Sequence, residues 1–139
     1  MIEIRHKNTG EVLLEVDSDT LRYADLRGAD LNWVDLWWVD FRNADLRYAD
    51  LRDACLRHAD LRYANLQDAD LRDADLRYAN LQDADLRYAD LRDADLSGAN
   101  LRRANLWRAD LRSANFWGAN LEGAIGINLD TSTTKGEAR

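Results

Sequence analysis

A five-residue hydrophobic period runs through most of this chain of 139 residues. Leu stands at position 21 and at every fifth position up to 121, except at Phe41 and Phe116, which gives 21 pentads without a gap. Two positions before the next pentad centre the residue is Ala in 19 of 21 cases, and Val34 and Val39 are the exceptions. From residue 25 to 120, Asp or Asn separates the two apolar positions, with Cys55 as a single replacement. The repeating unit is therefore Ala-(Asp/Asn)-Leu-x-x.

Neither an α-helix nor a straight strand can bury this pattern on one side. Five residues advance a helix by about 500°, so successive leucines would scatter around its axis. In a strand the side chains alternate between faces, so an odd period sends each successive leucine to the opposite face. Only a chain that turns a corner in every pentad keeps all the leucines inside. Asp and Asn suit such corners because their short side chains bond to nearby backbone groups, so we expect them to build the corners.

The repeats Ala-Asp-Leu-Arg-Tyr and Ala-Asn-Leu-Gln-Asp resemble those of the pentapeptide-repeat family. This resemblance implies an all-β fold, a right-handed quadrilateral (four-sided) parallel β-helix solenoid with four pentads in each coil. Leu and Ala would point inward and the other three residues outward. We expect this β-helix to span residues 21–124.

Both ends of such a solenoid need a cover, because an open coil exposes its core and unpaired backbone groups. The alternating apolar residues of 2–16, around a turn-like Lys-Asn-Thr-Gly segment, predict a β-hairpin. Residues 1–20 are therefore expected to form an N-terminal hairpin cap. Residues 125–139 are expected to form a C-terminal cap, in which Ile125, Ile127 and Leu129 close the last coil, and a frayed, flexible tail from 130 onward.

If positions 20 residues apart stack, one outer face is more acidic than the others. Its eight Asp and four Arg leave a net charge of −4, out of −7 for the whole chain. We expect this face to bind another protein. Its acidic residues are Asp30, Asp50, Asp53, Asp70, Asp73, Asp90, Asp93 and Asp110.

Three functions remain open at this stage. The first is a non-enzymatic protein-binding or structural module whose partner is unknown. The second, implied by the resemblance, is a DNA mimic that binds a type II topoisomerase such as DNA gyrase, although −4 is far below the ~15 charges that duplex DNA carries over ~25 Å. The third is an engineered repeat scaffold. Against any binding role, Arg follows the pentad centre at 13 of 21 positions and could simply neutralise the Asp column.

Large aromatic residues gather near both ends of the expected solenoid. Trp33, Trp37 and Trp38 fall in the first coil, where the hairpin would cover them. Because exposed Trp is enriched at interfaces, the second group suggests a homodimer formed through the C-terminal end. The residues of this expected dimer end are Trp107, Phe116, Trp117, Ile125 and Ile127. The five Tyr are spread over three faces and offer no single platform for stacking nucleic-acid bases.

Composition excludes several other classes of protein. A net charge of −7 and a pI near 4.8 argue against direct nucleic-acid binding. No apolar run approaches the ~20 residues of a membrane span. The N-terminal sequence lacks the features of a secretory signal, and one cysteine cannot form an internal disulfide, so we expect a cytoplasmic protein.

Catalytic and cofactor chemistry is not expected. Cys55 and His58 share a pentad, but Cys55 simply takes an Asp position, and a convex rod offers no pocket that excludes water. Arg beside nearly every carboxylate disfavours a bound Ca²⁺ or Mg²⁺. We therefore predict no catalytic, cofactor-binding or metal-binding residues.

Overall fold

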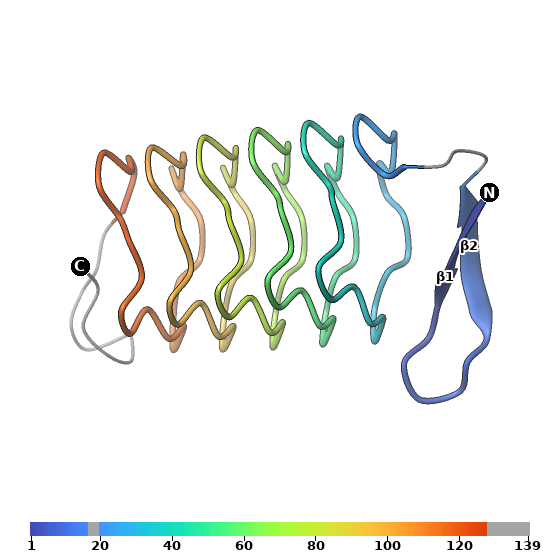
Figure 1. Cartoon of the computed structure of the whole chain (residues 1–139). Helices are drawn as coiled ribbons and strands as arrows, with labels where there is room; N and C mark the ends of the chain where they lie inside the picture. Colours follow the sequence, from blue (N-terminus) through green and yellow to red (C-terminus); the bar gives the residue numbers. More distant parts are fainter. Residues whose placement is uncertain (17–19, 128–139) are drawn as a thin grey trace.

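The computed structural model describes residues 1–16 and 20–127. Two short strands, β1 (Ile2–Arg5) and β2 (Val12–Val16), form a hairpin at one end, and the rest of the described chain winds into a rod of stacked coils (Figure 1). These residues contain no helix, and hence none long and apolar enough to cross a membrane. The fold is an all-β solenoid, as the pentad pattern predicts.

Hydrogen bonds between neighbouring coils fix the period of the solenoid. Parallel bridges join residues 20 apart, from Asp25 and Asp45 to Asn105 and Ile125, so each coil contains four pentads. In each interior coil the amide of the central Leu donates to the next coil, as Leu51 N does to the carbonyl of Asp70 at 2.8 Å. The backbone amides of Asp70 and Asp53 also bond across coils, so the backbone is satisfied without long strands.

The corner of each pentad lies after the Leu and not at the Asp or Asn. Ala49 N donates to the carbonyl of Leu46 at 3.1 Å, and between them Tyr48 has a φ of 60°. A left-handed residue at the third position of such a turn is the signature of type II geometry. All 21 pentads have it, with 17 non-glycine residues at φ between 53° and 61°. The prediction that Asp and Asn form the corners is therefore wrong, because the corner lies at the two residues that follow the Leu.

Asp and Asn instead support the turn from the residue before the Leu. Asp45 Oδ1 accepts a hydrogen bond from the backbone amide of Arg47, and Asn65 Oδ1 accepts one from that of Gln67 at 3.1 Å. These contacts are side-chain versions of a backbone turn. They hold the chain as it enters the corner, which explains why the Asx position is kept through 19 pentads.

The core follows the inward Leu and Ala predicted from the sequence. From Leu46 to Leu106 the central leucines are fully buried, and Phe41 and Phe116 fill the same position in their own coils. Every buried residue that the structure describes is hydrophobic. The interior is thus a continuous column of apolar side chains. All polar and charged side chains that the structure describes lie on the outside of the rod.

The hairpin contacts the first coil through both backbone and side chains. β1 and β2 pair antiparallel, with Ile4 opposite Leu14 and only 3% exposed because it packs into the core. Lys7 N donates to the carbonyl of Trp33 at 2.7 Å. The Lys7 ammonium lies 4.5 Å from the Trp33 ring centre and donates to the Asp53 carbonyl at 2.7 Å.

At the other end the repeat continues beyond residue 124. Ile125 pairs with Asn105 in the position that Asp or Asn takes elsewhere, so its side chain points outward and is 57% exposed. Ile127 is partly buried against the core. The expected roles of Leu129 and of the tail at 130–139 lie outside the described residues.

Replacing Leu71 tests the assignment of inside and outside. Leu71 is 0% exposed in a middle coil, so Leu71→Asp would bury an unpaired charge and should cost more than about 4 kcal/mol, enough to unfold the rod. Asp73→Ser, two residues away on the surface, should change the free energy of unfolding by less than about 0.5 kcal/mol. Urea denaturation followed by circular dichroism measures both, and equal effects would contradict the assignment.

Candidate protein-binding face

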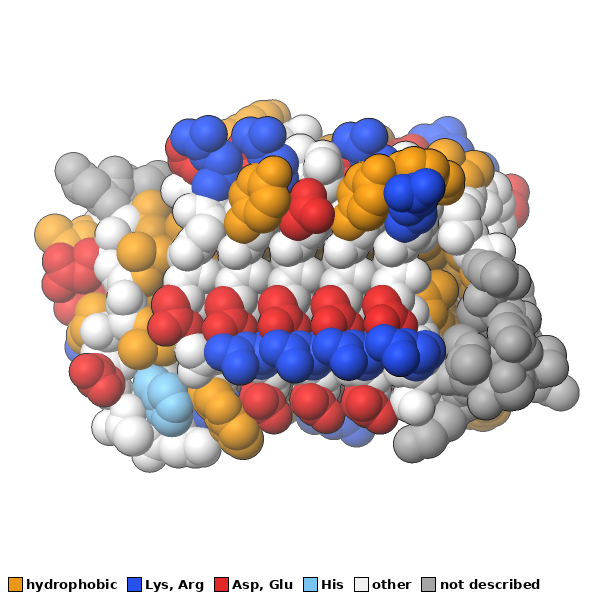
Figure 2. All heavy atoms as spheres, turned by 180° about the vertical axis from the view of Figure 1, so that it is seen from behind, with side chains coloured by type: hydrophobic (Ala, Val, Ile, Leu, Met, Phe, Trp, Pro, Cys, Tyr) orange, Lys and Arg blue, Asp and Glu red, His pale blue; other side chains and the backbone are white. Residues whose placement is uncertain are grey.

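The acidic face consists of the outward residues of the pentads centred on Leu31, Leu51, Leu71, Leu91 and Leu111. Parallel bridges link Asp30, Asp50, Asp70, Asp90 and Asp110 in one column, so the structure stacks these residues as the sequence predicts. Figure 2 shows two parallel rows of acidic side chains flanking one basic row. The face is therefore three columns wide, and its columns differ in how their charge is balanced.

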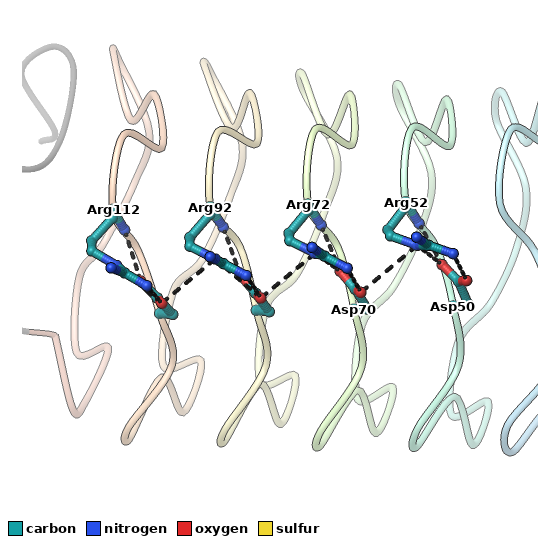
Figure 3. Close-up of polar contacts among 8 residues, drawn as sticks. Asp50, Arg52, Asp70, Arg72, Arg92 and Arg112 are labelled. Atoms are coloured by element: carbon teal, nitrogen blue, oxygen red, sulfur yellow. Dashed lines mark hydrogen bonds and ion pairs between the residues drawn. The ribbon is translucent and has the colours of Figure 1, made fainter.

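Arginine neutralises the first column almost completely. Arg72 Nε and Nη2 grip the two carboxylate oxygens of Asp70 at 2.8 and 2.6 Å. The same guanidinium lies 3.7 Å from Asp90 on the next coil. Figure 3 shows this pattern repeated from coil to coil, so that Asp and Arg alternate in a continuous ladder along the rod. Two-pronged contacts of this kind fix geometry as well as charge.

The same fork occurs wherever Asp precedes the pentad centre and Arg follows it, ten times in all. Hydrogen bonds from the Arg52 guanidinium hold the pKa of Asp50 below its ordinary value, while partial burial opposes the shift. Arg112 does the same to Asp110. The carboxylates of Asp50 and Asp110 thus remain charged well into acid.

The third column keeps its charge unbalanced. Asp53, Asp73 and Asp93 occupy the left-handed corner position, with φ of 57°, 59° and 61°. Within residues 1–16 and 20–127 their carboxylates accept no hydrogen bond and meet no cation at ion-pair distance. Asp30 lacks an arginine too and bonds to Asn32 instead. These four residues account for the net −4 of the acidic face.

The expected dimer-end residues are not one continuous patch. Trp107, Trp117 and Ile125 are exposed, whereas Phe116 is 1% exposed and belongs to the core of its coil. Trp107 contacts Tyr88 edge-on and lies under the Arg108 guanidinium. Any docking at this end would depend on the exposed residues and on Ile127.

Cys55 and His58 are held in different surroundings. Cys55 takes its place in the Asp and Asn column, while the His58 ring stacks between Trp38 at 4.3 Å and Tyr78 at 5.2 Å. No hydrogen bond joins Cys55 to His58 in the part of the chain that the structure describes, and no cluster of three His, Cys, Asp or Glu there could hold a metal ion.

Sequence reasoning missed the consequence of Cys55 for Arg57. With no carboxylate two residues before it, the buried Nε of Arg57 has no hydrogen-bond partner in residues 1–16 and 20–127, and the guanidinium lies 4.9 Å from the Trp37 ring centre. Of the 13 arginines that follow a pentad centre, it is the one without an ion pair among the described residues. A search of each column of residues 20 apart for a position without Asp or Asn would have identified Cys55 and hence Arg57.

Comparison with known proteins agrees with the repeat. The family of pentapeptide repeats matches residues 24–62, 54–93 and 89–125, in eight copies. HetL from the cyanobacterium Nostoc sp. strain PCC 7120, a pentapeptide repeat protein involved in heterocyst differentiation regulation, is 36% identical, with a TM-score of 0.65 over 76% of this chain. The match covers 44% of HetL, so the chain spans less than half of that relative.

Two further solved structures are similar. Another pentapeptide repeat protein from Nostoc PCC 7120 is 36% identical, with a TM-score of 0.55 over 70% of this chain and 84% of its own. Trypsin-treated QnrB1, a plasmid-mediated fluoroquinolone resistance protein, has a TM-score of 0.50 over 82% of this chain and 66% of its own. At 21% identity it shares the fold alone. A search of curated proteins gave no match.

The forks predict how stability depends on pH. Because the folded pKa values of Asp50, Asp60 and Asp110 lie below the ordinary 3.8, these groups stabilise the fold fully above that pH. Their contribution is lost as the pH falls through the lowered folded values. Thermal melts should therefore give a constant midpoint from pH 7 to about 5 and a decline below about 4. A decline that begins above pH 5 would contradict this account.

Restoring the missing carboxylate should stabilise the second coil. Cys55→Asp would give Arg57 the fork that ten other pentads have, worth about 0.5–1 kcal/mol at this partly exposed site. The thermal midpoint should rise by about 2–4 °C in dilute solution. Cys55→Ser removes the thiol without adding a charge and serves as the control. Equal midpoints for the Asp and Ser variants would show that Arg57 gains nothing from a carboxylate.

Proposed function

The chain belongs to the pentapeptide-repeat family, and on that premise we propose that it is a rigid, non-enzymatic module that binds another protein through its acidic face. The observation that carries this proposal is the contrast between two acidic columns. Asp50, Asp70 and Asp90 already have arginine partners, whereas Asp53, Asp73 and Asp93 have none among the residues that the structure describes. Charge that the fold itself leaves unbalanced is available to a partner.

The rigid backbone prepares this column for binding. Each Asp of the column stands on a corner fixed by cross-coil hydrogen bonds, such as Asp73 N to Arg92 O at 3.1 Å. Neighbouring carboxylates are therefore held about one rung, or ~4.8 Å, apart without any cost on binding. Basic side chains three or four residues apart on a helix have a similar spacing of about 5–6 Å. A basic helix lying along the rod would match the column.

A DNA mimic directed at a type II topoisomerase such as DNA gyrase is the second candidate. It is favoured by the straight course of the acidic column along the rod (Figure 2). The arginine forks weaken it, because Asp50, Asp70 and Asp90 then add no net charge. A mimic would rely on three carboxylates where DNA carries one charge per about 1.7 Å, so we rank this candidate below a basic protein surface.

We also infer the finer architecture from the family. A right-handed, four-sided coil accommodates the four pentads of each 20-residue turn. The contacts of the hairpin with Trp33 and Val34 support residues 1–20 as the cap of the first coil and 21–124 as the β-helix. Residues 125–139 would form the C-terminal cap and tail, of which 128–139 lie outside the described part. The free thiol of Cys55 suits a reducing compartment such as the cytoplasm.

Neutralising the unbalanced column tests the binding function. The variant Asp53→Asn, Asp73→Asn, Asp93→Asn should lose partners that the wild-type protein captures from cell extract, and its affinity for a purified partner should fall at least tenfold. The same affinity should weaken as salt rises, because the attraction is electrostatic. Affinity capture with mass spectrometry, followed by calorimetry at two salt concentrations, measures both effects.

A charge-matched variant provides the control. Glu11→Gln, Glu15→Gln, Asp68→Asn removes the same three charges from other surfaces and should leave binding within about twofold. Equal losses in both variants would mean that only net charge matters and would overturn the assignment to this face. Inhibition of gyrase supercoiling that the Asn variant loses would instead place the DNA mimic first.

A further inference from the structure

A second face of the rod, which we name the aromatic face, carries the outward residues of the pentads centred on Leu36, Leu56, Leu76, Leu96 and Phe116. At its corner position Trp38, His58 and Tyr78 stack with nearly parallel rings, 5° and 13° apart. Gly98 and Gly118 occupy the next two levels of the same column. The Tyr78 ring covers the level of Gly98, so only the last level of the column, at Gly118, is bare.

The backbone does not require glycine at the corner position. The corner position accepts 17 non-glycine residues elsewhere in this chain. Gly98 is needed because a Cβ there would come within 2.6 Å of the Tyr78 ring, which leans over it. A Cβ at Gly118 would meet no atom of the described residues within 4 Å. Open space therefore lies over Gly118 on an otherwise crowded face.

We propose that the aromatic face pairs with the same face of a second copy of this chain, in an antiparallel two-fold dimer. A two-fold axis that lies in the interface and crosses the rods at the level of Tyr78 sets each column against itself in reverse order. Trp38 then faces Gly118 of the second copy, and His58 faces Gly98. On each side of the axis the Trp38 ring meets the open position at Gly118, as an isologous interface requires, while His58 meets the Tyr78 ring that covers Gly98.

Charge is complementary under the same operation. Arg57 has no carboxylate in its own pentad, and Asp95 has no arginine in its own pentad, because Ser97 follows the centre. The ion pair of Asp95 is a long one, 3.9 Å to Arg77 on the preceding coil. These two pentads lie one level on either side of Tyr78. The two-fold axis therefore brings Asp95 of the second copy opposite the pentad of Arg57, twice in the dimer. Arg77, on the axis, is already neutralised by Asp75.

The exposed aromatic side chains supply a large part of the area that a specific contact needs. Trp37, Trp38, Tyr78 and Trp117 are 52%, 68%, 55% and 65% exposed. At roughly 100 Å² for each half-covered ring, two copies would bury about 800 Å² from these side chains alone, towards the ~1,200 Å² of a small specific interface. The aromatic face has a net charge of only −1, so a chain of net charge −7 can approach its copy here with the acidic faces turned away.

Analytical ultracentrifugation of the full chain over a concentration series tests the dimer. Gly118→Trp should fill the open position, keep the fold and weaken the dimer at least tenfold. Gly28→Trp is the matched control, because Gly28 has the same left-handed φ and equally free surroundings on another face. Trp38→Gly should also weaken the dimer, whereas the combined variant Trp38→Gly, Gly118→Trp should restore it, since a large side chain again faces a bare position.

Two further variants test the charge pairing. Asp95→Asn keeps the side-chain support of its turn but should weaken the dimer, while Asp60→Asn on another face should not. Cys55→Asp, which gives Arg57 a carboxylate of its own, should weaken it as well. A chain that stays monomeric up to ~1 mM, or a dimer unaffected by Gly118→Trp, would overturn the proposal. Because this face is distinct from the acidic face, the result leaves the proposed partner binding to be judged by its own variants.

Discussion

The backbone hydrogen bonds between residues 20 apart are the constraint on which the rest of the structure depends. They place each outward side chain directly above its counterpart in the next coil, at about 4.8 Å. A sequence that repeats Asp every five residues is therefore forced to stack like charges. In ten pentads the structure offsets this repulsion locally, because the arginine two residues after the Asp folds back to bind it. On the acidic face, Arg52, Arg72 and Arg92 also reach the Asp of the next coil (Figure 3). Surface ion pairs are individually weak, but here each one also removes a repulsion that the backbone would impose.

The rod has distinct faces because this pairing of Asp with Arg is interrupted at some positions. On the acidic face, no arginine among the described residues reaches Asp53, Asp73 or Asp93 at the corner position, so this face keeps unbalanced charge. On another face, the corner residue Asp83 is bound by Arg103 of the next coil. Where Cys55 replaces Asp, a guanidinium is left without its carboxylate and lies against Trp37 instead. Both departures lie outside a uniform interior of Leu and Ala, so the protein can vary its surface chemistry without altering what holds it together.

The spacing and alternation of the sequence were sufficient for the inward Leu and Ala and for the hairpin in residues 2–16. The stacking of residues 20 apart was expected only from the resemblance to the family, because a five-residue period does not fix the number of pentads in a coil. The corner was misplaced because Asp and Asn are favoured in turns generally, whereas the left-handed residue here is of eight different types, from Gly and Asp to Tyr, Trp and Arg, and carries no single compositional signal. The forks and the stack of Trp38 on His58 were not foreseeable in detail, because they depend on which way each side chain leans along the rod. Ile125 misled for a similar reason, since its apolar side chain occupies an outward position.

The uniform corner has a consequence for how such a surface can change. Since every pentad closes in the same way and four pentads complete a coil, adding or removing one pentad would leave the interior intact but rotate everything downstream by a quarter turn. A column of like residues would be cut at that point and continued on the adjacent side. The length of an insertion therefore decides which residues share a face. An insertion of 20 residues, or a multiple of 20, lengthens the existing columns. Any other multiple of five moves the downstream residues to different faces. Two rods with the same pentads in a different order would share a core and present unrelated surfaces.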